Sequence, residues 1–396
     1  MKLLDIVIDE KLLRDNKQTL ADINKSLLFE QDQHIYEEVD FDNDEFFLDP
    51  SLFCYLLDKA PNKRLTLQQV CLGNRLAADQ RIDLPIFFDE GGIAHLPGLG
   101  EFFAPELRGR IVSASMIPKE RRLLVPHGML EPLPGCLSFN TKWSFPVYLP
   151  EMLSREDKAP LRELPMQTLA GARGQLEEAL DFLSSHTAGF YSLLELVTRE
   201  VTVFNSPDQN SFAAITSHGA AFLNTENKQQ DALFFIDDLS HQCGHIIFNT
   251  LTLQTEEYLT LPKTTPLAEL LTVPGHSNRT LYGAFHGLFT YSCILHCLSA
   301  YFNHKNPSLS PEKKMVVLGR LGFYLVKFMV DLDSFYKIQQ VFTTKGLELF
   351  WQFINSYRSV HAMFGQYTDR YSYANQPYTF DESLFLELNA FVNDYQ

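Results

Sequence analysis

The pattern of hydrophobic and polar residues changes character around residue 160. In the first 150 residues, acidic and aromatic segments alternate with proline-rich turns and short β-like runs, as is typical of an irregular mixture of helices and strands. From residue 160 onward, apolar residues recur at three- and four-residue steps, which is the spacing of one face of an α-helix. We therefore predict an α+β fold with an irregular mixed α+β N-terminal region (1–150) and a mainly helical C-terminal region (151–396).

The same pattern predicts individual elements. Strands are expected where short β-rich runs lie close to proline or glycine, at 110–115, 122–125, 143–148, 201–205, 213–216 and 220–223. Helices are expected soon after residue 160 and at 231–253, 279–302, 310–330, 346–364 and 382–392. The helix at Ser310 has a clear start signal, because a serine cap precedes a proline at the first helical position.

Composition and charge narrow the class of protein. A chain of 396 residues with 45% hydrophobic residues can bury a large core. The chain has 33 basic and 49 acidic residues, and its net charge of −16 repels a phosphate backbone. We therefore do not expect a nucleic-acid partner.

The cysteines and the first residues bear on location. The six cysteines include no Cys-x-x-Cys pair, which argues against a zinc ribbon, and they show no sign of a disulfide framework. Asp5 and Asp9 interrupt the apolar run that a signal peptide requires, and no stretch of about 18 uncharged apolar residues follows. We expect a cytoplasmic protein without a membrane partner.

The segment Ser240-His-Gln-Cys-Gly-His245 carries the clearest chemical signal in the chain. His241 and His245 are four residues apart in a predicted helix, so both imidazoles lie on one face and can reach one divalent metal ion. The flanking residues are apolar, and two histidines on a buried helix need polar partners or a metal. We predict a metal site here, and two hydrogen-bonded core histidines are the alternative interpretation.

Gln242 distinguishes this segment from the zinc-peptidase pattern His-Glu-x-x-His. The glutamine stands where that pattern has its general base, and an amide cannot take a proton from water. Peptide hydrolysis of that type is therefore disfavoured. The metal site itself is unaffected, because position 242 is not a ligand.

A third metal ligand is expected from the predicted helix that begins at Arg279. His286 is the best candidate, because in a helix it lies nearly in phase with Arg279, with Tyr282 on the same face. This face would then offer one ligand and one fixed cation. The reserve ligands are His218, Glu256 and Glu257.

The order of elements around this motif resembles a bacterial family known for a His-Glu-x-x-His motif in peptide modification. Its characterised members are similar to iron(II)- and 2-oxoglutarate-dependent peptide β-hydroxylases. The resemblance covers roughly residues 165–300. It is carried by a strand at 217–224, the metal helix at 233–251 and the later histidine-containing segment at 283–289.

The resemblance implies that His241, His245 and His286 bind iron(II), and that Arg279 binds the distal carboxylate of 2-oxoglutarate. Tyr282, on the same face, is the second candidate for contact with this co-substrate. An oxygenase needs open metal positions and an apolar surround, but it needs no carboxylate base beside the metal. Glutamine at position 242 is therefore compatible with this chemistry, although it is a departure from the family that bears on the choice of substrate.

Three functions remain open at this point. The expected one is an iron(II)/2-oxoglutarate-dependent oxygenase that hydroxylates, desaturates or cyclises an unactivated carbon of a peptide or amino-acid-like substrate. The second is a zinc-dependent hydrolase that uses another base, such as Glu256 or Glu257. The third is a non-catalytic metal-binding protein.

Overall fold

The computed structural model describes residues 2–59, 64–75, 80–133, 143–148, 161, 163–226, 228–271 and 279–392. The chain forms two compact units, and each unit consists of discontinuous segments. Unit 1 comprises Met1–Lys11, Gln175–Leu194 and Gln229–Gln396, and unit 2 comprises Leu12–Gly174 and Glu195–Lys228. The predicted boundary between residues 150 and 151 lies outside the described residues.

The predicted fold class is confirmed, since helices dominate the C-terminal half and the N-terminal half mixes helices with small sheets. Three helices contribute residues to both units: α1 (Glu10–Gln31), α5 (Pro165–His186) and α6 (Ala188–Val197). The other helices and strands of unit 1 are β1 (Lys2–Leu3), β2 (Ile6–Val7), α7 (Ala232–Leu251), α8 (Leu267–Leu270), α9 (Leu281–Lys305), α10 (Pro311–Lys337), α11 (Thr344–Thr368) and α12 (Glu382–Leu388).

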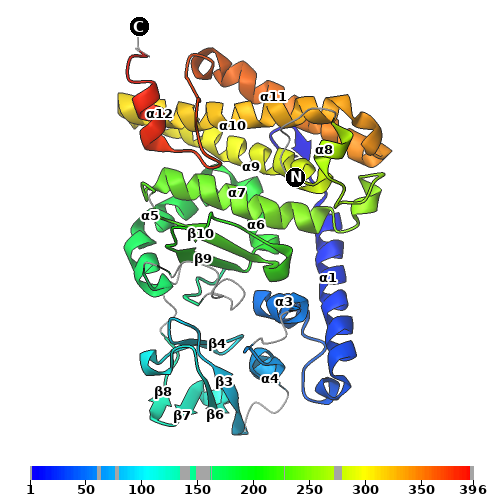
Figure 1. The fold of residues 1–396 in the computed structure, drawn as a ribbon, viewed down its shortest axis with the longest axis vertical. Helices are drawn as coiled ribbons and strands as arrows, with labels where there is room; N and C mark the ends of the chain where they lie inside the picture. Colours follow the sequence, from blue (N-terminus) through cyan, green and yellow to red (C-terminus); the bar gives the residue numbers. More distant parts are fainter. Residues whose placement is uncertain are drawn as a thin grey trace. The chain divides into compact units, whose positions relative to one another are not determined.

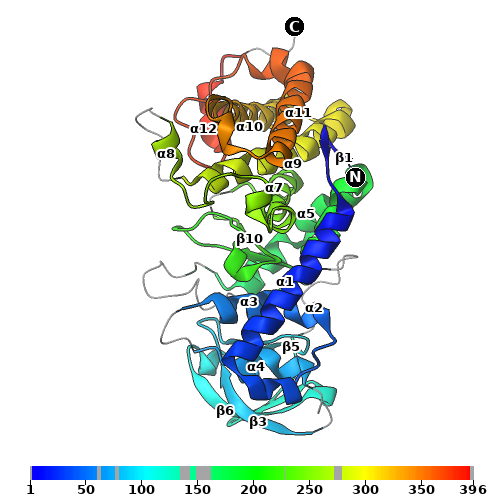
Figure 2. The ribbon, with the colours of Figure 1, turned by 90° about the vertical axis from the view of Figure 1, so that its right-hand side faces the viewer.

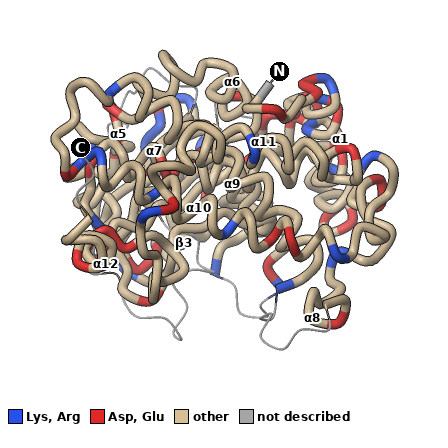
Figure 3. The backbone as a smooth tube through the Cα atoms, turned by 90° about the horizontal axis from the view of Figure 1, so that it is seen from above, with Lys and Arg blue, Asp and Glu red and all other residues tan. Residues whose placement is uncertain are grey.

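Helix α9 is the central element of unit 1. It packs against α7, α10 and α11, and Figures 1 and 2 show it between α7 and α10. Its sequence explains this position, because Lys305 at the C-terminal end is its only Asp, Glu, Lys or Arg. Figure 3 shows the tube of α9 almost entirely without charged residues. A helix that is apolar on all sides is stable only when other elements cover it.

The predicted helices of unit 1 are present, with shifted ends. Asp231 caps α7 by accepting a hydrogen bond from the backbone N–H of Phe234 at 2.9 Å. Ser310 caps α10 as predicted, but α10 continues to Lys337, well past the expected end at 330, because Leu332 and Phe335 extend its buried face. Helix α12 ends at Leu388 rather than at 392.

Unit 2 combines small sheets, mostly antiparallel, with short helices. One sheet has the strand order β3-β6-β7-β8, β4 and β5 form a hairpin, and β9 pairs with β10 in parallel. Large apolar residues such as Phe88, Phe102 and Met116 fill the core under the first sheet. The helices and strands that lie wholly in unit 2 are α2 (Asp44–Phe47), α3 (Pro50–Leu57), α4 (Leu67–Cys71), β3 (Ile82–Phe87), β4 (Ile93–Leu96), β5 (Gly100–Phe103), β6 (Ile111–Ile117), β7 (Arg122–Val125), β8 (Gly128–Leu130), β9 (Glu200–Phe204) and β10 (Ala220–Asn224).

Two strand predictions in unit 2 are wrong. Residues 143–148 form only an isolated bridge between Ser144 and Glu200, because the backbone N–H groups of Val147 and Tyr148 donate to the Glu101 carboxylate instead of to a strand. Residues 213–216 run into a short 3-10 helix (Ile215–Ser217), where a three-residue turn replaces the expected extended backbone.

No described helix combines the length and the apolar composition that crossing a lipid bilayer requires.

Gly346 is a position where the packing of unit 1 tolerates no side chain. It lies in the first turn of α11, and a Cβ there would be 1.9 Å from the carbonyl oxygen of Tyr258. Gly346→Ala is therefore expected to lower the free energy of unfolding by about 1–3 kcal/mol, although alanine is the better helix former. The control is Gly174→Ala in α5, where a Cβ meets nothing within 4 Å and a gain of up to about 1 kcal/mol is expected. Urea unfolding midpoints that shift in the same direction in both variants would contradict this prediction.

Candidate metal centre

Helix α7 places two of the predicted ligands one turn apart. The centroids of the His241 and His245 rings are 5.0 Å apart, as the four-residue spacing requires. Almost all of α7 is buried, including the apolar residues Ile236 and Ile247 on either side of the pair. Imidazoles in such surroundings need a hydrogen-bond partner or a metal.

Helix α9 brings the third predicted ligand, His286, into contact with this pair. His245 Nδ1 and His286 Nε2 are 2.9 Å apart, and the same His286 nitrogen is 3.2 Å from the backbone oxygen of His245. The two helices approach closely at Gly244, where a Cβ would lie 3.3 Å from the sulfur of Cys293 and 3.4 Å from a methyl carbon of Thr290. The contact between α7 and α9 therefore holds all three histidines in one region.

The electrostatic surroundings keep these histidines neutral. Burial lowers the pKa of His245 to about 4. Burial also holds the pKa values of His241 and His286 well below the usual range, and the charges of His245 and then Lys327 add to this effect at His241. Neutral imidazole is the form whose lone pair binds a divalent metal, so the protonation state fits a metal centre.

The nitrogens of the three histidines are not all close enough to one another to hold one metal ion as they stand. His241, His245 and His286 do not each offer a nitrogen within 4.8 Å of the others, and in the described parts of the chain only Asp49, His95 and Glu200 of unit 2 meet that distance. In unit 1 the hydrogen bond between His245 and His286 directs two ring nitrogens at each other. Metal binding at these histidines would replace that hydrogen bond.

Arg279 lies close to the cluster, although not through the helical phase that the sequence predicted. Helix α9 begins at Leu281 with Thr280 as its cap, so Arg279 precedes the helix. Its guanidinium nevertheless reaches Gly287, where a Cβ would be 2.8 Å from Arg279 Nη2. Arg279 Nη1 donates to Asp331 Oδ1 at 2.8 Å, and the Asp331 side chain is 6% exposed. The cation beside Gly287 therefore already has a buried carboxylate partner from α10.

Lys327 is a second cation in this region that the sequence reasoning missed. Burial, followed by the charge of Arg279, lowers its pKa to about 8. Its ammonium group donates to the carbonyl oxygen of Tyr378 at 2.7 Å and lies 4.2 Å from the centroid of the Tyr378 ring. The only signal in the sequence was a single lysine within the apolar run at 323–330.

The other two predicted site residues have partners within unit 1. Gln242 Nε2 donates to Asp238 Oδ1 at 3.2 Å, which holds this side chain along α7. The hydroxyl of Tyr282 is 2.8 Å from Thr252 Oγ1 and 3.0 Å from Asn249 Oδ1, at the C-terminal end of α7. Its ring is nevertheless close to the cluster, with a centroid 5.5 Å from that of His286.

None of the reserve ligands joins the histidines in a set of three. Glu256 and Glu257 lie in a 3-10 helix (Thr255–Glu257) and are exposed, and Glu257 pairs with Lys345 at 2.5 Å. His218 belongs to unit 2, where burial lowers its pKa to about 4.

The depressed histidine pKa values predict a fold that is sensitive to acid. His245 has a pKa of about 4 in the folded chain, against about 6.5 for histidine in an unfolded chain. Between these values the unfolded chain binds more protons, so this contribution to stability is complete above about pH 6.5 and is lost as the pH falls. When the pH is lowered from about 7.5 to about 5.5, the titration of His245 alone is expected to lower the free energy of unfolding by about 1.4 kcal/mol.

Urea unfolding in EDTA at these two pH values tests this expectation. His245→Gln should lose about 1.4 kcal/mol less than the wild type, because glutamine does not titrate. An identical pH dependence in both proteins would show that His245 titrates alike in the folded and unfolded chains.

As a donor set, the cluster offers three neutral imidazoles with a guanidinium group close by. Imidazole ligands suit zinc, iron, copper and nickel, so the donors fit a transition metal without selecting one of them. Comparison with known proteins adds no family to this description, since no protein-family model and no curated protein matches the chain.

Proposed function

We propose that the chain is an iron(II)- and 2-oxoglutarate-dependent oxygenase whose metal is bound by His241, His245 and His286. The observation that carries the proposal is the contact between His245 and His286, 2.9 Å between ring nitrogens, which joins the predicted motif on α7 to the predicted third ligand on α9. Three neutral imidazoles in one region, two of them buried and that of His245 partly buried, are a more specific combination than the sequence motif alone.

Iron(II) in this centre would activate O₂ with electrons from 2-oxoglutarate, giving succinate, carbon dioxide and a hydroxylated substrate. In this proposal the histidines supply the metal ligands and leave other metal positions open for the co-substrate and O₂. The apolar residues around α7 keep bulk water away from the centre. In this proposal Gln242 takes no part in proton transfer. Its hydrogen bond to Asp238 would instead help to position α7.

Arg279 is the proposed anchor for the distal carboxylate of 2-oxoglutarate. The guanidinium has five N–H donors, and Asp331 Oδ1 and the carbonyl oxygen of Gly283 accept hydrogen bonds from two of its nitrogens. The group can therefore form a fork with a second carboxylate while Asp331 fixes its position. In this proposal Tyr282 lines the same region with its ring.

The zinc hydrolase is less well supported. Of its two candidate bases, Glu257 is paired with Lys345, and both glutamates are exposed rather than directed into a buried centre. The proposed substrate remains a peptide or an amino-acid-like molecule, and the proposed location is the cytoplasm.

The test is a titration of anaerobically purified, iron(II)-loaded protein with 2-oxoglutarate, followed by calorimetry and, after O₂ is admitted, by succinate formation. Arg279→Lys and Arg279→Gln should weaken 2-oxoglutarate binding by about 10-fold or more, since losing a hydrogen bond to a charged group costs about 1.5 kcal/mol or more. Their iron content should stay unchanged. Arg358→Lys, at an exposed arginine of α11, is the matched control.

The alternatives give different results in the same experiment. Iron binding without any heat or succinate from 2-oxoglutarate would overturn the oxygenase and leave a metal-binding protein. Tight zinc binding together with zinc-dependent peptide cleavage would favour the hydrolase. If all three arginine variants bind 2-oxoglutarate like the wild type, Arg279 is not the anchor.

A further inference from the structure

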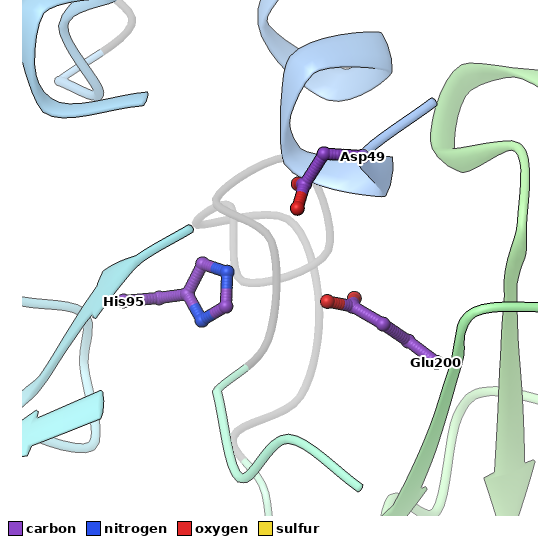
Figure 4. Close-up of side chains that lie close together, drawn as sticks. All are labelled: Asp49, His95 and Glu200. Carbon is purple, nitrogen blue, oxygen red and sulfur yellow. The ribbon is translucent and has the colours of Figure 1, made fainter. Parts of the chain in front are cut away.

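Unit 2 contains a separate cluster of ligand-type side chains. Asp49, His95 and Glu200 each offer one atom, and these atoms all lie within 4.8 Å of one another. Figure 4 shows the imidazole and the two carboxylates directed toward one another. Asp49 directly precedes α3, His95 lies in β4, and Glu200 is the first residue of β9, so three distant segments of the chain meet here.

His95 is partly buried, and its two ring nitrogens make no hydrogen bond with any described residue. Its ring stacks on Tyr148 with centroids 3.8 Å apart, and both ring nitrogens are buried without a hydrogen-bond partner among the described residues. Buried polar atoms almost always have a partner, so a histidine of this kind calls for one. A metal ion coordinated by one ring nitrogen would supply it.

Glu200 is a buried carboxylate with weak hydrogen bonding. It is 6% exposed, and the Tyr148 hydroxyl lies 3.5 Å from its Oε2. The neighbouring cation, Arg199, is paired with Glu45. A divalent cation between Asp49 and Glu200 would supply positive charge to both carboxylates.

The residues around the cluster hold the ligands in place. Glu101 accepts hydrogen bonds from the backbone N–H groups of Val147 and Tyr148 at 2.9 and 3.0 Å, and its Oε1 lies 3.8 Å from His95 Nδ1. A carboxylate behind a ligating histidine is the usual outer partner in metal sites, and it leaves Nε2 for the ion. Asp49 Oδ1 accepts from the backbone N–H of Ser51 at 2.9 Å, so its other oxygen is available.

We propose that Asp49, His95 and Glu200 form a binding site for a divalent transition-metal ion, Mn²⁺ or Zn²⁺, that ties α3, β4 and β9 together within unit 2. One nitrogen and two carboxylate oxygens suit these ions, because carboxylates favour Mn²⁺ and imidazole favours Zn²⁺. The site is independent of the histidine cluster of unit 1, and it does not rest on the proposed oxygenase activity.

The experiment removes the unit 1 ligands first. The full chain carrying His241→Ala and His245→Ala is stripped with EDTA and titrated with Mn²⁺, which is followed by electron paramagnetic resonance, and in parallel with Zn²⁺. We expect one equivalent of metal to remain bound. Adding Glu200→Gln or Asp49→Asn should weaken binding by at least about 10-fold, because each change removes a charged ligand while keeping the size of the side chain. The matched control is Glu106→Gln, which changes an exposed carboxylate of unit 2 outside the cluster.

A background variant that binds neither Mn²⁺ nor Zn²⁺ would overturn the proposal. Glu200→Gln and Asp49→Asn that bind metal as tightly as Glu106→Gln would also overturn it. Asparagine preserves the helix cap at position 49, so Asp49→Asn carries the test if Glu200→Gln fails to fold. Metal should also raise the unfolding temperature of the background variant and leave that of Asp49→Asn unchanged.

Discussion

Replacing His245 with alanine is expected to abolish Fe²⁺ binding at the proposed metal centre of unit 1. His245 is the central member of the cluster, because its ring is 5.0 Å from that of His241 and its Nδ1 is 2.9 Å from His286 Nε2. Loss of an outer partner already weakens metal binding by about 10- to 100-fold, so loss of a direct ligand should exceed about 100-fold. The measurement is an anaerobic Fe²⁺ titration of the wild type and of His245→Ala. Circular dichroism checks that the variant is folded.

Two further variants make this titration specific. His296→Ala removes another histidine of α9, whose ring faces Phe190 at 6.3 Å between centroids, and it should bind Fe²⁺ like the wild type. Both variants, His245→Ala and His296→Ala, are also measured with Glu200→Gln added, so that metal bound at the proposed site of unit 2 does not mask the loss of Fe²⁺ binding. Equal Fe²⁺ affinity in His245→Ala and His296→Ala would show that the cluster is a set of hydrogen-bonded core histidines.

Replacing Arg320 with methionine is expected to lower the free energy of unfolding by about 3–5 kcal/mol. Arg320 on α10 donates to Asp237 on α7 at 2.8 Å and to Glu382 at the start of α12 at 3.2 Å. The side chains of Arg320 and Asp237 are only 7% and 5% exposed. Methionine fills most of the space but takes the cation away from the buried Asp237 carboxylate, whereas Glu382 keeps Lys313 at 3.9 Å. An uncompensated buried charge is costly.

Lys337→Met on the same helix is the control for this effect. Lys337 pairs with Asp333 at 2.6 Å, but the two side chains are 56% and 62% exposed, so water screens the pair. Its loss should change the free energy of unfolding by less than about 0.5 kcal/mol. Urea unfolding followed by circular dichroism compares the two variants. Similar changes in the free energy of unfolding of the two variants would mean that the burial of the Arg320 ion pair does not determine its contribution to stability.

The positions of most helices could be predicted from the sequence because their determinants are local. Periodicity relates residues three and four apart, and a cap relates a side chain to a backbone N–H two or three residues later, as at Asp231 and Ser310. Strands were less predictable, since a strand also needs a partner. Residues 143–148 have a β-like composition, yet the Glu101 carboxylate takes the N–H groups that a sheet would have used.

The candidate metal centre also has features that local sequence predicted and features that depend on long-range packing. The pairing of His241 with His245 follows from the length of one helical turn, and it was therefore visible in the sequence. His286 was predicted from its place in the helix expected at 279–302, and the family resemblance implied the same residue. Its contact with His245 exists only because α7 and α9 pack closely at Gly244. The position of Arg279 was predicted from a helical phase that the structure does not contain, since α9 begins after it.

The sequence by itself thus determined the fold class, the apolar character of α9 and the histidine pair of α7, because each depends on residues within a few positions of one another. Only the tertiary structure decided that Asp331 binds Arg279, that Lys327 lies beside this pair, and that Asp49, His95 and Glu200 converge in unit 2. Such contacts depend on which elements pack together and at what rotation. Local patterns carry no record of that choice, because many long-range pairings satisfy the same hydrophobic periodicity.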